Sequence, residues 1–218
     1  MKLKITAIVL ALASSSYGAS ITLSSFAETY NGQDDYGILL ANGTPVAPSA
    51  GLAQVIVFST LTDLQVSTLA GAADYATLFA AGAFVSLASD DFTGINTAYG
   101  PTAGFVSAGV SGLATGSTVV NRTMYAYITS GTNLGLFKTN SILVADGVPP
   151  AIESSYSLNF SAGTAIIGGY GTDYLVPTYV GGSSETVNSF QLVDAVPEPS
   201  AALLGAVGAL GLLRRRRI

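Results

Sequence analysis

Hydrophobic and polar residues alternate along several short stretches of the chain, a period of two that is typical of β-strands with one buried face. In residues 20–26, Ile21 and Leu23 share one face, and in residues 123–129 three aliphatic side chains oppose two tyrosines. Residues 130–133 (Ser-Gly-Thr-Asn) then form a loop of hairpin length. Further strand-like stretches lie at residues 134–138, 141–145, 164–167, 174–176 and 186–193.

Two stretches depart from simple alternation. Residues 52–60 are apolar on both faces, which predicts a buried strand in the centre of a sheet. Residues 67–81 place Leu69 and Phe79 at helical spacing before Gly82, so we expect one or two helical turns packed on a sheet. No repeat of 20–50 residues is visible, which argues against a solenoid or propeller. The predicted fold is mainly β, an antiparallel β-sandwich-like domain with one short helix.

The N-terminal pattern is different and has the layout of a secretory signal peptide. Lys2 and Lys4 give a basic start, residues 5–13 are apolar, and mostly small residues follow as far as Ser20. We predict a signal peptide over residues 1–18, with cleavage a residue or two later as the alternative. The chain from residue 19 onward is then exported by the secretion machinery, as a β-rich domain over residues 19–195.

The C-terminal pattern has three parts: a short proline-rich motif, an apolar run over residues 201–213 and a basic end. As a helix the apolar run would rise about 20 Å, short of the roughly 30 Å of a bilayer core, so it is a marginal transmembrane helix. The two prolines keep the acid between them out of a helix. Basic residues stay on the cytoplasmic side of a membrane. The motif is Pro197, Glu198 and Pro199, and the basic end is Arg214, Arg215, Arg216 and Arg217.

Together these three parts, residues 196–218, closely resemble the PEP-CTERM sorting signal of Gram-negative bacteria. The resemblance implies recognition of Pro197, Glu198 and Pro199 by an exosortase-like membrane processing enzyme, with the arginines as a stop that retains the helix. It also implies transient anchoring in the inner membrane and then a place at the cell surface or in the extracellular matrix, with exopolysaccharide as a possible partner. The resemblance covers residues 196–218 alone. It indicates where the protein is sent and does not indicate an activity.

Without its two ends the chain is strongly acidic. The whole chain has a formal net charge of −5, but six of its eight basic residues lie in the first four residues and in the final arginine run. Residues 19–196 keep twelve acids against Arg122 and Lys138, a net charge of −10. Nucleic acid is excluded as a partner, because its binding depends on many lysine and arginine contacts to phosphate.

The residue types also restrict the chemistry. The chain has no histidine and no cysteine, so a Ser-His-Asp triad, a Cys-His pair and the common zinc sites cannot be built. A Ser–Lys dyad would have to use Lys138, which we interpret more simply as the end of a strand. Residues 168–171 (Gly-Gly-Tyr-Gly) are interpreted as a turn between strands, since no helix follows them as in a phosphate-binding loop. We therefore predict no enzyme activity and no cofactor.

Two acidic pairs are weak metal candidates: Asp34 with Asp35, and Asp90 with Asp91. Loop carboxylates can supply oxygens to Ca²⁺, but neither pair has the spacing of an EF-hand. We interpret them as solvated loop acids. The predicted function is an exported, non-catalytic surface or extracellular-matrix protein. The alternative is an exported carbohydrate- or calcium-binding module, supported by these acids and by tyrosines that could stack on sugars: Tyr99, Tyr125, Tyr127, Tyr156, Tyr170, Tyr174 and Tyr179.

Overall fold

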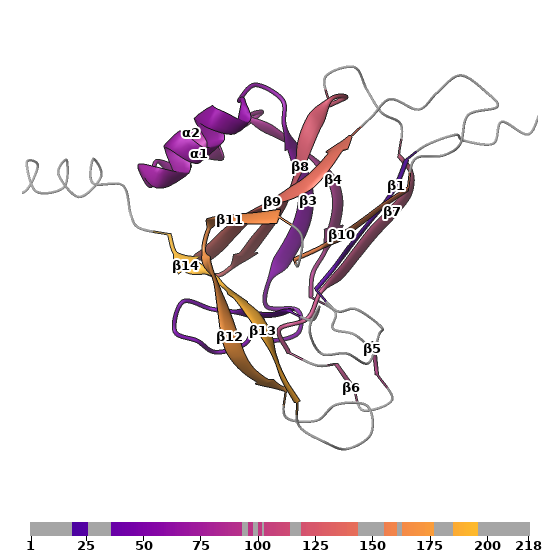
Figure 1. Cartoon of the computed structure of the whole chain (residues 1–218), viewed down its shortest axis with the longest axis vertical. Coiled ribbons are helices and arrows are strands. Elements are labelled where there is room, and N and C mark those ends of the chain that lie inside the picture. Colours follow the sequence, from indigo (N-terminus) through magenta and orange to yellow (C-terminus); the bar gives the residue numbers. More distant parts are fainter. Residues whose placement is uncertain are drawn as a thin grey trace, which may run out of the picture.

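The computed structural model is mainly β, and its described residues form several sheets of largely antiparallel strands and two short helices (Figure 1). This confirms the predicted fold class at that level. The structure describes residues 19–25, 36–92, 96–97, 100–101, 103–113, 119–143, 155–160, 163–176 and 185–195.

The largest sheet has six strands, in the order β11-β9-β8-β3-β4, with β14 pairing to β9. Strand β3 is an interior strand between β8 and β4, and its Val55, Ile56 and Val57 are fully buried because both faces of the sheet are covered there. The buried strand predicted at residues 52–60 is confirmed over Leu52–Phe58 as an interior strand, and residues 59–60 lie beyond its end. The six strands are β3 (Leu52–Phe58), β4 (Phe84–Asp90), β8 (Arg122–Ser130), β9 (Asn133–Leu143), β11 (Gly163–Ile167) and β14 (Val193–Asp194).

Two three-stranded sheets, of order β10-β1-β7 and β12-β13-β2, accompany it, and β5 pairs with β6 alone. Among the described strands, β1 with β10 and β13 with β2 are parallel, and the other pairs are antiparallel. The strands are β1 (Ala19–Ser24), β7 (Ser107–Leu113), β10 (Ser155–Asn159), β2 (Tyr36–Leu39), β12 (Gly169–Val176), β13 (Glu185–Gln191), β5 (Asn96–Thr97) and β6 (Gly100–Pro101).

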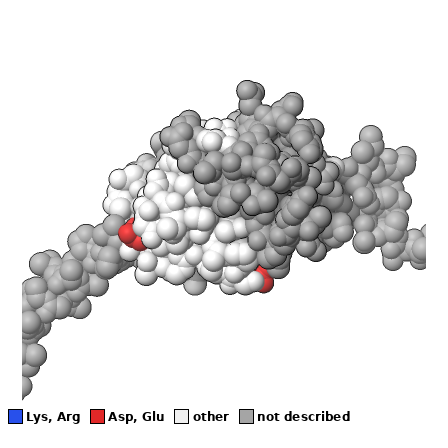
Figure 2. All heavy atoms as spheres, turned by 90° about the horizontal axis from the view of Figure 1, so that it is seen from below, with Lys and Arg blue, Asp and Glu red and all other residues white. Residues whose placement is uncertain are grey.

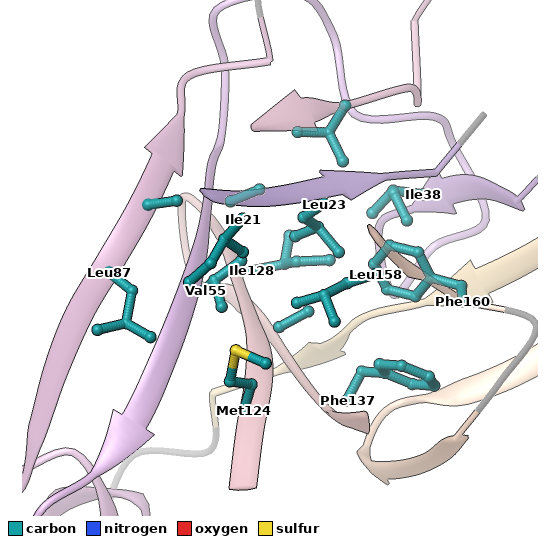
Figure 3. Close-up of a cluster of buried hydrophobic side chains, with 14 of the residues drawn as sticks. Ile21, Leu23, Ile38, Val55, Leu87, Met124, Ile128, Phe137, Leu158 and Phe160 are labelled. Carbon is teal, nitrogen blue, oxygen red and sulfur yellow. The ribbon is translucent and has the colours of Figure 1, made fainter. Parts of the chain in front are cut away.

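A first hydrophobic cluster fills the space between the six-stranded sheet and the two smaller sheets. Figure 3 shows Ile21 and Leu23 of β1 directed toward Val55 of β3 and Ile128 of β8. These side chains have no solvent exposure. The alternation in residues 20–26 and 123–129 therefore places one apolar face of each strand in this cluster, as the sequence predicts.

A second hydrophobic cluster lies on the other face of the six-stranded sheet, beneath the helices (Figure 1). It contains Val66 and Ala70 of α1 (Asp63–Gly71), Leu78 of α2 (Tyr75–Leu78) and, from the sheet, Phe58 and Tyr125. The tyrosines of β8 thus lie opposite its aliphatic residues because both faces of this strand are covered, one by strands and one by helices.

The helical prediction at residues 67–81 is right in kind and wrong in extent. Thr62 caps α1 through a capping box with Gln65, so the helix begins at Asp63, four residues before the predicted start. Ala73 has a φ of 54°, which ends the first helix and separates α1 from α2. The structure therefore has two helices, of nine and four residues, where one was predicted.

Several strand predictions need correction. Strand β9 runs without a break to Leu143, so residues 134–138 and 141–143 are one strand instead of two. Lys138 lies inside this strand and not at its end. The hairpin loop at residues 130–133 is confirmed, because Ser130 pairs with Asn133. Strands β2, β4, β5, β6, β7 and β10 were not predicted. Strand β2 has four residues, β5 and β6 have two each, and β7 (Ser-Ala-Gly-Val-Ser-Gly-Leu) lacks a clear apolar face.

The predicted signal peptide at residues 1–18, the sorting signal at residues 196–218 and the pair Asp34 and Asp35 lie outside the described residues. Within the described ranges, no helix is both long enough and apolar enough to cross a membrane.

Candidate functional site

The carboxylate of Asp63, the first residue of α1, has three polar side-chain partners. It accepts hydrogen bonds from the Tyr125 hydroxyl at 2.8 Å and the Thr123 hydroxyl at 2.9 Å. The Lys138 Nζ atom forms an ion pair with it at 2.7 Å. Thr123 and Tyr125 project from β8 and Lys138 from the adjacent β9. The cluster therefore ties the start of the helix to two strands of the six-stranded sheet.

Arg122, the other basic residue between residues 19 and 196, contacts the backbone of the segment that precedes Asp63. One of its guanidinium nitrogens donates to the Ser59 carbonyl at 3.0 Å and another approaches the Leu61 carbonyl at 3.5 Å. Arg122 and Lys138 are the two basic residues between residues 19 and 196. Both are therefore used to hold residues 59–63 against β8 and β9.

The pKa shifts in this cluster favour a structural role for Asp63 and Tyr125 over general acid–base catalysis. Partial burial raises the pKa of the Asp63 carboxyl. The hydrogen bonds from Lys138, Tyr125 and Thr123 and the charge of Lys138 outweigh this effect, so the pKa lies below its ordinary value. Burial, and then the hydrogen bond to Asp63, raise the pKa of the Tyr125 hydroxyl strongly, which keeps it a neutral donor. Lys138 is ion-paired with a carboxylate, which argues against its use as the base of a Ser–Lys dyad.

Replacing Asp63 by asparagine should lower stability at neutral pH by about 1 kcal/mol or less, because the ion pair is partly exposed and screened by solvent. A carboxyl with a lowered pKa in the folded state stabilises the protein above its ordinary pKa and loses that contribution as the pH falls through the lowered value. The gap in thermal midpoint between wild type and Asp63→Asn should therefore be full at pH 7 and shrink below about pH 4. A gap that widens on acidification would contradict this assignment, and Asp91→Asn serves as the matched exposed control.

The acidic pair Asp90 and Asp91 lies at the end of β4, where Asp91 is exposed. In the part of the chain that the structure describes, no three acidic side chains gather closely enough to hold a metal ion. The next residue, Phe92, is buried with a φ of 57°, and its carbonyl accepts the Ser49 N–H at 3.1 Å. The chain therefore turns inward just after the pair and buries an aromatic side chain. The two acids lie immediately before this turn.

We expect residues 19–195 to keep their β-type circular dichroism and their thermal midpoint when a calcium and magnesium chelator is added. Their stability would then come from the two hydrophobic clusters and not from a metal. Loss of the β signal in chelator, restored by Ca²⁺, would instead make Asp34, Asp35, Asp90 and Asp91 structural ligands. Asp90→Asn with Asp91→Asn, compared in the same titration, would locate the site.

The glycine-rich stretch at residues 168–171 forms the corner between two strands. Gly168 has a φ of +101°, and a Cβ atom there would lie 2.5 Å from the Gln191 carbonyl oxygen, so the corner requires glycine. Gly169 then begins β12. The predicted turn is confirmed at Gly168, and the rest of the stretch belongs to the strand.

Tyr125, Tyr127 and Tyr170 do not form an open stacking platform. Tyr125 is 1% exposed, and Tyr127 is stacked on Phe79 with ring centroids 4.3 Å apart. Burial raises the pKa of the Tyr127 hydroxyl. Tyr170 is 46% exposed, but its hydroxyl donates to the Phe160 carbonyl and its ring packs on Phe137. Tyr99, Tyr179 and the side chain of Tyr174 lie outside the described residues.

A shallow open depression of about 390 Å³ lies on the outer surface of the two helices. Leu64 of α1 is 77% exposed there, the highest value for a large hydrophobic side chain in the described residues. The sequence prediction missed this surface because it placed the start of the helix after Leu64. Its lining residues are Leu61, Leu64, Gln65, Thr68, Leu69 and Thr77.

The described part of the surface carries few charges on the face seen in Figure 2, where isolated acidic groups stand among uncharged atoms and no basic group is visible. Comparisons of the chain with protein-family models, with curated proteins and with solved structures find no match. The functional argument therefore rests on the residues of this chain alone.

Proposed function

We propose that this chain is an exported, non-catalytic surface or extracellular-matrix protein of a Gram-negative bacterium, sorted by its C-terminal signal. In this proposal residues 1–18 direct secretion, residues 19–195 form an antiparallel β-sandwich-like domain, and residues 196–218 hold it transiently in the inner membrane. An exosortase-like enzyme then recognises Pro197, Glu198 and Pro199, and the domain passes to the cell surface or into exopolysaccharide.

The observation that carries this proposal is the order of three features in the tail: a proline-flanked glutamate, 13 apolar residues and four arginines. An extended acidic motif outside the membrane is accessible to an enzyme, whereas the arginines resist transfer across the bilayer. A short apolar span between them gives modest membrane affinity. Glycines at residues 205, 208 and 211 leave a small-residue surface on which a membrane enzyme could pack, although glycine is abundant throughout the chain.

The geometry of the domain supports a structural role. Arg122 and Lys138 hold the segment at the start of α1. The Asp63 carboxylate is paired with Lys138 and accepts a hydrogen bond from Tyr125 of β8. These three charged side chains are thus used to hold elements of the fold together. A domain without cysteine must rely on its hydrophobic core for stability outside the cell, and the two clusters on the six-stranded sheet supply one.

Substitution of Glu198 by glutamine, or of Pro197 and Pro199 by alanine, tests the recognition motif. In the native host these variants should remain at the inner membrane with the tail intact, because the processing enzyme no longer binds them. Asp194→Asn is the matched control, since it removes a nearby exposed acid outside the motif. Processing of the Glu198→Gln variant at the normal rate would contradict the proposal.

A further inference from the structure

The solvent-exposed positions of α1 are unusual because none of them carries a charged side chain. A surface helix normally turns charged side chains to water, but the exposed positions of α1 are Leu64, Gln65, Ser67, Thr68 and Gly71. Asp63, at its first turn, is paired with Lys138 and directed toward the sheet. The exposed positions of the helix are thus neutral and include a leucine in its first turn.

Further leucines extend this neutral surface. Leu61 and Leu69 line the same depression as Leu64, and its remaining lining residues are uncharged. A single exposed leucine is common in proteins and has no meaning by itself. Leu61 and Leu69 are partly buried against the second hydrophobic cluster, and their exposed edges join Leu64 in a small depression that is lined by leucines and uncharged polar side chains. The nearby acid Asp74 caps α2 by accepting the Thr77 N–H at 3.1 Å.

The chain leaves the domain on the same side of the six-stranded sheet. Val193 and Ala195 pack against the second hydrophobic cluster, which also contains Val66 and Ala70 of α1. The Ala195 N–H donates to the Thr132 carbonyl at 2.7 Å, which fixes the exit point. Five residues then separate Ala195 from the apolar run at residues 201–213, a reach of roughly 20 Å when fully extended.

A membrane anchor at residues 201–213 would therefore hold the helical side of the domain close to the bilayer. The net charge of −10 over residues 19–196 opposes contact with anionic lipid. A zwitterionic lipid surface has no such penalty and suits neutral side chains such as Gln65 and Thr68 around a leucine. These features favour lipid over a charged protein partner.

We propose that the surface formed by Leu61, Leu64, Leu69 and their neutral neighbours contacts a zwitterionic membrane surface while the tail anchors the chain. This inference rests on the proposed function, because it requires residues 201–213 to be embedded in the membrane. The contact orients the domain, with α1 and α2 against the lipid. The linker with the Pro-Glu-Pro motif is then confined to the narrow space beside the membrane, where a membrane enzyme acts.

The chain has no tryptophan, so a single introduced tryptophan reports on one position. The exported protein with its tail intact and Leu64→Trp is mixed with phosphatidylcholine vesicles, with and without brominated acyl chains. We expect co-sedimentation with the vesicles, a shift of tryptophan emission to shorter wavelength and loss of most of its intensity with brominated lipid. Thr68→Trp, at a second exposed position in the same depression, should show the same shift and quenching. It keeps the test valid if the Leu64→Trp variant does not fold.

Tyr170→Trp is the matched control, because Tyr170 is half-exposed and packs on Phe137 of the first cluster, on the opposite face of the sheet from the helices. Its emission should not respond to brominated lipid. Replacing part of the phosphatidylcholine by phosphatidylglycerol should reduce quenching at residue 64, since the domain is acidic.

The outcomes separate the two proposals. Co-sedimentation without any change at residue 64 or 68 would leave the anchor intact and overturn the lipid contact. Failure to co-sediment would overturn the anchor and the lipid contact with it. A short-wavelength emission already present without vesicles would also overturn the lipid contact: it would indicate a second copy of the chain if it depends on concentration, and the tail folded back on the helices if it does not.

Discussion

Replacing Phe137 by alanine is expected to lower the free energy of unfolding by about 3–5 kcal/mol. The side chain has no solvent exposure, and its ring lies 5.0 Å from Phe160 and 6.3 Å from Phe190, measured between centroids. It projects from β9 and meets Phe190 of β13 and Phe160 just after β10. A cavity at this position removes contacts among all three main sheets at once, and the rigid strands around it cannot close it.

Urea unfolding measures this effect, as a lower midpoint with an unchanged dependence on urea concentration. A small domain has about 5–15 kcal/mol of stability in total, so the loss is a large fraction of it. The matched control is Ile142→Ala in the same strand, because Ile142 is 53% exposed and leaves no cavity when truncated. Equal losses for the two variants would contradict the position of Phe137 in the core.

The second large effect is expected in the tail. Replacing Arg214, Arg215, Arg216 and Arg217 together by serine should let the tail slip through the membrane, so that unprocessed protein appears in the medium. Each arginine costs about 2.5–3.5 kcal/mol at the centre of a bilayer, and the short apolar run provides little retention by itself.

The matched control for this experiment is the replacement of the same four arginines by lysine, which keeps the charge and should keep the retention. C-terminal mass and cell fractionation measure both variants. Normal surface processing of the serine variant would show that the arginines have no retention role.

The parts of the fold that the sequence predicted are those in which side-chain pattern alone decides the structure. Residues 52–58 form an interior strand because apolar side chains on both faces require cover on both sides. The alternation in β8 separates Met124 from Tyr125 because the two faces of this strand enter different clusters. In both strands the local pattern of apolar and polar residues is enough to predict the structure.

The parts that the sequence did not predict depend on long-range contacts. Strand β7 has little apolar character, and it becomes a strand because β1 pairs with it along its length. The start of α1 was misplaced because the capping box of Thr62 and Gln65 was overlooked, although this signal is local and readable. The anchor of Asp63 on Lys138 joins residues 75 positions apart in the chain, which no sequence pattern reveals.

The candidate site divides in the same way. The proposed tail motif is a run of consecutive residues and is found from the sequence alone, whereas the leucine-lined depression on the helices is visible only in three dimensions. The sequence makes Asp90 and Asp91 weak candidates for a metal site. The structure places no third acidic side chain close enough to them, among the described residues, to hold a metal ion.

The central claim is that the tail is a sorting signal that is cut after it has held the chain at the membrane. The C-terminal mass of the protein isolated from the cell surface of its native host tests this most directly. The account predicts a chain that ends near Pro197, Glu198 and Pro199 and lacks Arg214 to Arg217. Surface-located protein that still carries all four arginines would contradict it and leave a plain C-terminal anchor.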